Sequence, residues 1–310
     1  MMSNLGLQKA IIKALAYFDI FDYPLTLVEL HKWLYQPDKT YSLYEVSIEL
    51  EKISQIESKF GFYFLSGRQG IVRTRLDRYK LAEKKFKIAL RAATWLRWLA
   101  FVKMIAVCNN VGYNNASKDS DIDFFIIAQK KYLWWTRLSV TLVTTLLGIR
   151  RKGDKVVDRI CLSFYIGSDH LNLEDISLPQ VDPYLIYWFA TLAPIYDLDA
   201  YESFIQNNSW LKQYLPNVYL TKLNNRRQIK DNAYISFSKV VDKTILNSFI
   251  GIWLEGLARA VQFRKVKKYL GNSLNKDNTD VIISTNMLKL HKIDRRSLYK
   301  DAWIKKLINL

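Results

Sequence analysis

The stretch SKDSDIDFFII, residues 117–127, carries three aspartates at alternate positions and then becomes entirely apolar. The apolar part predicts a buried strand, because short uninterrupted apolar runs are typical of strands covered on both faces. Alternate side chains of a strand share a face, so Asp121 and Asp123 are expected to project together, with Ile122 and Phe124 turned into the core. The sequence therefore predicts two neighbouring carboxylates at the entrance of a core strand.

The predicted carboxylate pair is a candidate metal-binding site, since neighbouring carboxylates repel each other unless a positive charge neutralises them. Their oxygens are ligands that Mg²⁺ and Mn²⁺ prefer, and these ions also hold nucleotide phosphates. The alternative interpretation is a turn at Asp119 and Ser120 followed by a solvated strand end. The alternation of aspartates alone does not choose between the two.

Strands and helices alternate around this stretch. Short apolar strands are predicted at 103–111, 120–128 and 158–166. A helix is predicted at 131–149 between the last two strands, and a long amphipathic helix at 79–103. Residues 79–176 are therefore predicted to form an α/β core with a small mixed sheet.

The region before this core has helical spacing followed by a β-hairpin pattern. Apolar positions repeat with the helical period over residues 7–18, and two capping boxes follow, each of which begins a helix. The boxes are Thr26 with Glu29, and Ser42 with Glu45. Two β-prone runs within residues 60–76, on either side of a glycine-containing loop at 66–70, predict a hairpin with its second strand at 71–76. Three helices followed by a hairpin is the order of a winged helix, so residues 1–78 are predicted to form a winged helix-like domain.

Residues 177–310 are predicted to form a helical C-terminal region, which makes the fold class α+β. The expected helices span 181–194, 199–214, 228–270 with breaks, and 284–308. A linker is expected at 270–280, where Asn, Ser and charged residues are frequent.

Basic residues dominate the charge of the chain, with a formal net charge of +17 and a sequence pI of about 9.6. Such a balance favours a polyanionic partner: nucleic acid, nucleotide or an acidic membrane surface. Arg68, Arg73 and Arg75 lie in the predicted hairpin and are the expected contacts to RNA or DNA. A solvated charged face is the alternative interpretation of the same residues.

The sequence predicts a cytoplasmic protein without stable membrane insertion. The N-terminus lacks the apolar run and cleavage site of a signal peptide. The most apolar segment, 132–148, is short for a membrane span and contains Arg137. Cys108 and Cys161 lie in apolar runs without metal-ligand spacing, so both are expected to be reduced core residues.

Residues 109–123 resemble the signature of the DNA polymerase β-like nucleotidyltransferase superfamily. That signature is a strand, a glycine followed by Gly or Ser, a spacer, and D-h-D entering the next strand. Here Asn109 and Asn110 stand at the glycine pair, 111–120 is the spacer, and Asp121 and Asp123 are the aspartates. The segments YFDIFDYPLT, SFIQNNSWLKQYLPN and MLKLHKIDRR are similar to bacterial nucleotidyltransferase-domain proteins, and this likeness covers most of the chain.

The resemblance implies that Asp121 and Asp123 hold two divalent ions, Mg²⁺ or Mn²⁺, for in-line attack on the α-phosphate of an NTP. Asn109, Asn110 and Ser120 are then the expected nucleotide-binding residues. Asn is the non-glycine residue best suited to left-handed backbone, so the turn can form without glycine.

The superfamily also has a third carboxylate on a neighbouring strand, where this chain has Cys161 and Ser163. Asp158 is the expected catalytic substitute, and Asp154 and Glu174 are weaker candidates. A site without a third acid would be slow or inactive.

Three functions are open at this stage. The leading one is a Mg-dependent nucleotidyltransferase that moves a nucleoside monophosphate from an NTP to a hydroxyl of RNA, protein or a small molecule. The alternative is a catalytically decayed nucleotidyltransferase fold that acts as a winged-helix nucleic-acid-binding regulator. The third is a peripheral membrane protein that uses the basic segment 251–270 on anionic lipid.

Overall fold

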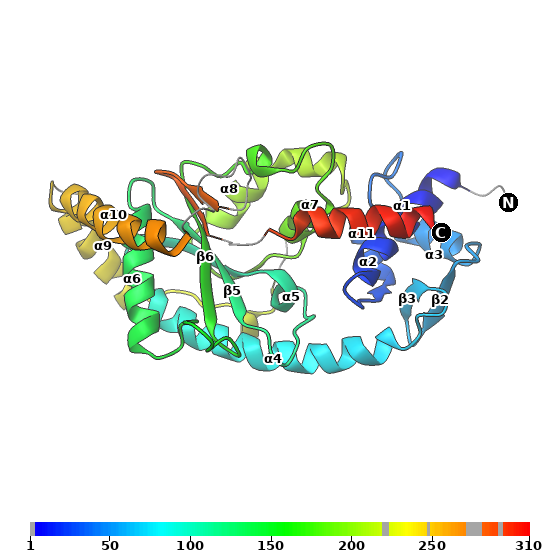
Figure 1. Ribbon diagram of the computed structural model, residues 1–310, viewed down its shortest axis with the longest axis horizontal. Coiled ribbons are helices and arrows are strands. Elements are labelled where there is room, and N and C mark those ends of the chain that lie inside the picture. The colour runs from blue at the N-terminus through cyan, green and yellow to red at the C-terminus, as the bar shows by residue number, and fades with distance from the viewer. Residues whose placement is uncertain (1–3, 219–222, 247–248, 271–280, 291–293) are drawn as a thin grey trace.

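The computed structural model describes residues 4–218, 223–246, 249–270, 281–290 and 294–310, and its fold is α+β as predicted. Figure 1 shows an elongated molecule with a mixed six-stranded sheet in its middle. The N-terminal helices and a small three-stranded sheet lie at one end, and a pair of helices lies at the other. The C-terminal helix returns to the end formed by the N-terminal helices.

The N-terminal region follows the predicted order of three helices and a hairpin, with one additional short strand. Its elements are α1 (Leu5–Asp19), β1 (Leu25–Thr26), α2 (Leu27–Lys32), α3 (Leu43–Leu50), β2 (Ile56–Lys59) and β3 (Phe62–Leu65), in a sheet of order β1-β3-β2. Both predicted capping boxes are present, at Thr26 with Glu29 and at Ser42 with Glu45. Local sequence therefore determines where α2 and α3 begin.

The hairpin lies earlier in the chain than predicted. It turns at Phe60 and Gly61, which both have positive φ, and its second strand ends at Leu65. The prediction of a second strand at 71–76 was wrong, because these residues begin the helix α4 (Ile71–Leu96). A strand would direct Ile71 and Val72 to opposite faces, whereas on the helix both pack in one small cluster with Phe64.

Helix α4 begins before the predicted 79–103 helix, and it runs unbroken through the predicted domain boundary at residue 78. Figure 1 shows it running from the N-terminal region along the lower side of the molecule, beneath the central sheet. Its buried face consists mainly of alanines and larger apolar residues at helical spacing: Ala82, Phe86, Ala89, Ala92, Ala93 and Leu96. Small side chains on this face allow the helix to lie close to the core.

The central sheet has the strand order β7-β4-β5-β6-β9-β8. Its strands are β4 (Val102–Val107), β5 (Ile122–Ala128), β6 (Ile160–Gly167), β7 (Ala193–Asp197), β8 (Val281–Ile283) and β9 (Met287–Leu290). Among the described strands, only β5 and β6 pair in parallel, and α6 (Leu133–Leu146) connects them. The mixed sheet and its first three strands agree with the prediction.

The last three strands were missed. The predicted helix 181–194 extended into the start of β7, no element was predicted for the residues of β8, and β9 lies within the predicted helix 284–308. Strand β7 pairs antiparallel with β4, and β9 pairs antiparallel with β6. These partners are distant in the sequence, and they provide the hydrogen bonds that make short segments extended. The C-terminal region is therefore not wholly helical, since it completes both sides of the sheet.

The remaining helices cover the sheet or extend from it. They are α5 (Asn109–Gly112), α7 (Pro183–Ala190), α8 (Ala200–Asn207), α9 (Ala233–Leu246), α10 (Phe249–Leu270) and α11 (Arg296–Ile308), with 3₁₀ turns at Glu174–Ile176, Ser209–Gln213 and Asn225–Arg227. Residues 271–280 of the predicted linker lie outside the described residues. Among the described residues, no helix has the length and apolarity needed to span a bilayer.

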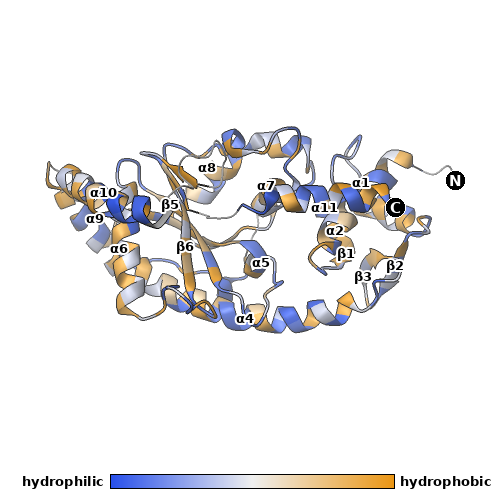
Figure 2. Ribbon diagram, in the orientation of Figure 1, coloured by the Kyte–Doolittle hydropathy of each residue, from blue (hydrophilic) through white to orange (hydrophobic). Residues whose placement is uncertain are grey.

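The core lies on both faces of the sheet. On one face, Phe125, Ile127 and Phe164 pack with α1, α7 and α8. On the other face, Phe124 and Ile126 pack with α4 and α6. Figure 2 shows the hydrophobic strands at the centre, between these helices. The alternation within β5 leaves Asp121 and Asp123 on the side of α7, as the strand period requires.

Candidate active site at the entrance of β5

Asp121 and Asp123 come together as predicted, at the start of β5. The backbone at the start of β5 is hydrogen-bonded to the residues next to β6 and β4. Ile122 N donates to Arg159 O at 2.9 Å, and Cys108 N donates to Asp123 O at 3.0 Å. The side chain of Asp121 is 15% exposed. The site is therefore a half-buried carboxylate pair on a fixed strand and not a solvated strand end.

Cys161 is the third member of this cluster. It lies opposite Asp123 in the parallel β5–β6 register. One carboxylate oxygen each from Asp121 and Asp123 and the Cys161 sulfur all lie within 4.8 Å of one another. Burial and the two carboxylates raise the pKa of the Cys161 thiol, so the sulfur remains protonated at neutral pH. The third group beside the carboxylate pair is thus a neutral thiol and not a carboxylate.

The two carboxylates differ in their partners. Arg151 Nη1 donates to Asp121 Oδ2 at 2.6 Å, which gives that carboxylate a full counter-charge. Asp123 interacts with neutral donors, the Asn109 amide Nδ2 at 2.8 Å from its Oδ2 and the Cys161 thiol. Burial, followed by the charge of Asp121, raises the pKa of Asp123 to about 6. Asp123 is therefore the carboxylate that most needs a cation.

The turn after β4 contains a residue in the left-handed region. Asn109 adopts φ 55°, in agreement with the expectation that Asn supports this turn. Its side chain connects two parts of the site, because it donates to Asp123 and accepts a hydrogen bond from the Tyr184 hydroxyl at 3.0 Å. Asn110 is exposed, and its Oδ1 accepts from Tyr113 at 2.8 Å. Asn109 is thus a positioning group for Asp123.

Asp158 does not join the carboxylate pair. Its Oδ1 accepts a hydrogen bond from Lys85 Nζ at 2.5 Å, and Lys85 also donates to Ser120 O at 2.7 Å. The Ser120 hydroxyl donates to Ser117 O at 3.1 Å, within its own turn. Asp158 and Ser120 therefore hold the two loops that enter β5 and β6, with buried Lys85 between them.

The weaker candidates for a third acid also lie apart from the pair. Asp154 is exposed in the loop before β6, and Glu174 is exposed at the start of a 3₁₀ turn. Within the part of the chain that the structure describes, neither belongs to a cluster with metal-ligand spacing.

Lys85, Arg151 and Tyr184 were not identified from the sequence as parts of the site. Lys85 carried a signal, because it lies at helical spacing within the apolar stripe of Ala82, Phe86 and Ala89. A lysine in such a stripe has to find a buried partner. Arg151 and Tyr184 had no local signal, since only the folding of distant segments brings them to the aspartates.

A cavity of about 160 Å³ adjoins the site on the far side of Asn109. Its aromatic lining includes Tyr184, Trp188 and Tyr299, and the rings of Tyr184 and Tyr299 are stacked with centroids 5.3 Å apart. Lys289, Asp294, Arg295 and Arg296 close it from the C-terminal segment. The cavity therefore combines ring faces with charged groups next to the carboxylate pair.

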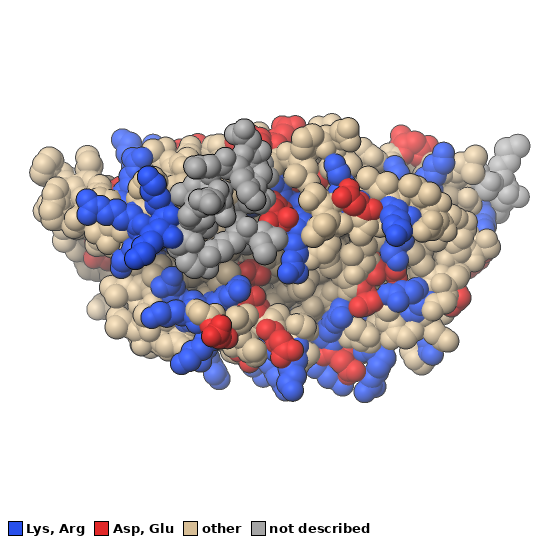
Figure 3. Space-filling view, viewed as in Figure 1, with Lys and Arg blue, Asp and Glu red and all other residues tan. Residues whose placement is uncertain are grey.

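The three arginines predicted to bind nucleic acid are paired with acids. Arg68 contacts Asp19 and Asp22 at 2.8 and 2.6 Å. Arg73 contacts Asp77 at 3.0 Å, with its own side chain 78% exposed. On the face in Figure 3, basic and acidic side chains are interspersed over this end of the molecule.

Arg75 is held by contacts within the N-terminal region. It donates to both carboxylate oxygens of Glu29, at 2.8 and 2.7 Å, and its side chain is 13% exposed. Its guanidinium also lies over the rings of Tyr23 and Phe62. Arg73 and Arg75 are on α4, and Arg68 follows the hairpin, so none of the three lies within the hairpin that was expected to carry them.

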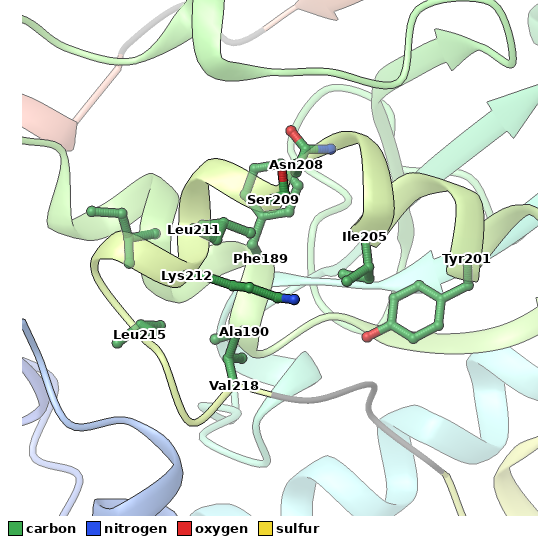
Figure 4. Close-up of a pocket in the computed structure, with 11 residues that line it drawn as sticks. Phe189, Ala190, Tyr201, Ile205, Asn208, Ser209, Leu211, Lys212, Leu215 and Val218 are labelled. Carbon is green, nitrogen blue, oxygen red and sulfur yellow. The ribbon is translucent and has the colours of Figure 1, made fainter. Parts of the chain in front are cut away.

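A separate, apolar cavity of about 30 Å³ lies among α7, α8 and the following 3₁₀ turn. Figure 4 shows that Phe189, Ile205, Leu211 and Leu215 line it and that the Lys212 side chain extends toward Ile205 and Tyr201. It has room for about one water molecule. It is a packing space in the helical cover and lies apart from the carboxylate pair.

No family model matches the chain, and neither a curated protein nor a solved structure shows significant similarity to it. A function for this site therefore has to be argued from its residues and their geometry.

Proposed function

We propose that this protein is a metal-dependent nucleotidyltransferase that moves a nucleoside monophosphate from an NTP to a hydroxyl of an acceptor. The observation that carries the proposal is the half-buried Asp121–Asp123 pair, which follows a turn with a left-handed residue at Asn109. The turn, the spacer and the strand entrance then serve the roles that the sequence resemblance implies.

The residues of the site fit a divalent cation. Asp121 and Asp123 supply oxygen ligands at close spacing, and burial together with the charge of Asp121 raises the pKa of Asp123, an effect that a bound cation would offset. Mg²⁺ and Mn²⁺ accept two carboxylates and complete their coordination with water and substrate phosphates. When bound, such ions neutralise charge on the phosphates and activate the attacking hydroxyl. Neutral Cys161 would remain beside the site.

The protein's own residues prepare this arrangement. Asn109 holds one oxygen of Asp123, which leaves the other available. Arg151 neutralises Asp121 and is 45% exposed, so its side chain is free to turn toward a triphosphate that binds beside the pair. The aromatic faces of Tyr184, Trp188 and Tyr299 in the adjoining cavity suit the base of the nucleotide.

A second candidate function is a catalytically decayed nucleotidyltransferase fold that binds nucleic acid as a regulator. Cys161 favours it, because a thiol replaces the acid that would help to hold or activate the reactants. The N-terminal order of helices and strands is also that of a winged helix. Of the three arginines predicted to contact nucleic acid, Arg73 is the most exposed, whereas Arg68 and Arg75 are held more closely by their acidic partners.

Transfer of label from each α-labelled NTP, with Mg²⁺ or Mn²⁺ and total RNA or protein as acceptor, tests the leading function. We expect transfer by the parent chain and loss by at least about a hundredfold in Asp121→Asn and Asp123→Asn. Asp119→Asn is the matched control, because Asp119 is an exposed carboxylate on the same loop. Transfer that survives in Asp123→Asn would contradict the proposal.

Absence of transfer with every acceptor would leave metal binding to be measured directly, by the loss of the free Mn²⁺ electron-spin signal. Mn²⁺ binding that depends on Asp121 and Asp123 but supports no transfer would favour the decayed fold. Salt-dependent nucleic-acid binding that both aspartate variants retain would then identify the regulator.

A further inference from the structure

Helices α9 and α10 expose many large apolar side chains at one end of the molecule. Phe249 is 83% exposed, the largest exposed fraction among the described large apolar residues. The other members of this apolar surface are Phe237, Val240, Val241, Ile252, Trp253 and Leu257, all more than 40% exposed. Figure 1 shows both helices projecting from the sheet at the end opposite the N-terminal region. Surfaces of this kind mark interaction sites.

Contacts on the inner side fix the orientation of both helices. The carboxylate of Glu255 accepts hydrogen bonds from Trp134 N and Trp135 N at 2.9 and 2.7 Å, at the start of α6. Gln262 Nε2 donates to Trp134 O at 2.7 Å. On α9, buried Lys239 pairs with Asp231 at 2.7 Å. The apolar surface therefore faces outward because the opposite side of each helix is committed to the core.

The same two helices are strongly basic. Between residues 233 and 270 the sequence has seven Lys and Arg against two acids, and one of those acids is Glu255 on the inner side. Exposed cations follow the apolar residues toward the end of α10: Arg259, Arg264, Lys265, Lys267 and Lys268. Figure 3 shows Lys and Arg side chains gathered at this end of the molecule.

We propose that α9 and α10 form a docking surface for an anionic lipid membrane. The apolar side chains would enter the boundary between headgroups and acyl chains, while the cations contact the headgroups. Because no described helix can span a bilayer, the helices would lie in the interface. This inference is independent of the proposed nucleotidyltransferase activity.

Charge and side-chain type favour lipid over two other occupants. A second copy of the chain would bring two like-charged helix pairs together, which costs interaction energy. Nucleic acid would match the charge but stacks on aromatic rings, whereas aliphatic side chains outnumber aromatic ones on this surface. An anionic membrane satisfies both the apolar and the basic residues.

Flotation of the full chain with vesicles tests the inference. We expect binding to vesicles of phosphatidylcholine with phosphatidylglycerol, weak binding to phosphatidylcholine alone, and a decrease as salt is raised. Phe249→Ser together with Trp253→Ser should weaken binding by at least about tenfold, because two exposed rings no longer insert. Arg264→Glu with Lys265→Glu should weaken it on anionic vesicles.

Phe60→Ser is the matched control, since Phe60 is 80% exposed at the opposite end of the molecule and should leave flotation unchanged. Thermal unfolding of each variant verifies that these exposed substitutions preserve the fold. Failure to float with anionic vesicles would overturn the proposal, as would equal loss in the Phe60 variant. The proposal would also be overturned if Phe249→Ser left flotation unchanged but abolished a dimer seen in sedimentation velocity. The same holds if it left flotation unchanged but abolished nucleic-acid binding.

Discussion

At the scale of single residues, Asp121 and Asp123 are close in space but differ in electrostatic state. Asp121 has the Arg151 guanidinium as a counter-charge. Asp123 accepts a hydrogen bond from the Asn109 amide, and burial together with the charge of Asp121 raises its pKa. The strand period predicted their common direction, but the difference between them depends on which distant side chains reach each carboxylate.

The raised pKa of Asp123 predicts a cost to stability in the metal-free protein. Its pKa rises from 3.8 to about 6, so the folded state binds the proton more tightly than the unfolded state. Below pH 3.8 the carboxyl is protonated in both states, so its burial as a neutral group carries no electrostatic cost. That favourable state is lost as the pH rises through 6, and above it the ionised group lowers the free energy of unfolding by about 2–3 kcal/mol. Asp123→Asn, which cannot ionise, should therefore be more stable than the parent at neutral pH.

Denaturant unfolding in a chelator measures this difference. We expect the advantage of Asp123→Asn to shrink by more than half between about pH 8 and about pH 4.5. Asp119→Asn should show no such dependence, because Asp119 is exposed. An advantage of equal size at both pH values would mean that the pKa of Asp123 is not raised in the folded protein.

At the scale of elements, α4 organises the site through one buried cation. Lys85 reaches Asp158 in the loop before β6 and Ser120 O in the loop before β5. The helix therefore fixes the relative position of the two strands that carry Asp123 and Cys161. A charged residue within an apolar stripe is costly, and its partners offset that cost only in the folded state.

Removal of this cation should destabilise the protein. For Lys85→Met we expect a loss of about 1–3 kcal/mol, because Ser120 O loses a donor while the 51% exposed Asp158 side chain can be rehydrated. Lys87→Met is the control, since Lys87 is exposed on the same helix and should change stability by less than about 0.5 kcal/mol. Equal losses in chemical denaturation would show that Lys85 is not the link between the loops.

At the scale of the whole molecule, the C-terminal segment joins the sheet to the N-terminal region. Strand β9 pairs with β6, and α11 then packs against α1, where Trp303 Nε1 donates to Lys13 O at 2.9 Å. Between them, buried Arg296 contacts Asp182 and Asp294, each at 2.7 Å. Figure 1 shows α11 extending from α7 to the N-terminal helices. Helix α11 thus links the region of the central sheet to α1.

Arg296 should be essential to this closure. Arg296→Ala leaves the carboxylates of Asp182 and Asp294 buried with reduced compensation, so we expect a loss of about 3–5 kcal/mol in the free energy of unfolding. Arg295→Ala, at the exposed neighbouring position, should have little effect. If both variants unfold at the same denaturant concentration, the pairing of Arg296 does not hold α11 in place.

Local signals were sufficient for several elements. The capping boxes at Thr26 and Ser42, the apolar strands at β4, β5 and β6, and the shared face of Asp121 and Asp123 all follow from side chains a few residues apart. Such features depend on backbone geometry with a period of 2 or 3.6 residues, so the sequence by itself determines them. Helix α4 was also expected, although its first turns were mistaken for a strand.

Tertiary structure alone decided the rest. Strands β7 and β9 are extended because distant strands complete their hydrogen bonds, and β8 joins the sheet by pairing with the neighbouring β9. Asp158 was expected at the metal site, yet it pairs with Lys85 on α4 and lies outside the cluster of Asp121, Asp123 and Cys161. Arg151 and Tyr184 reach the site from distant segments. Burial and charge pairing depend on which segments meet in space, and no local period encodes that. The sequence thus determined the carboxylate pair, and the fold decided its partners.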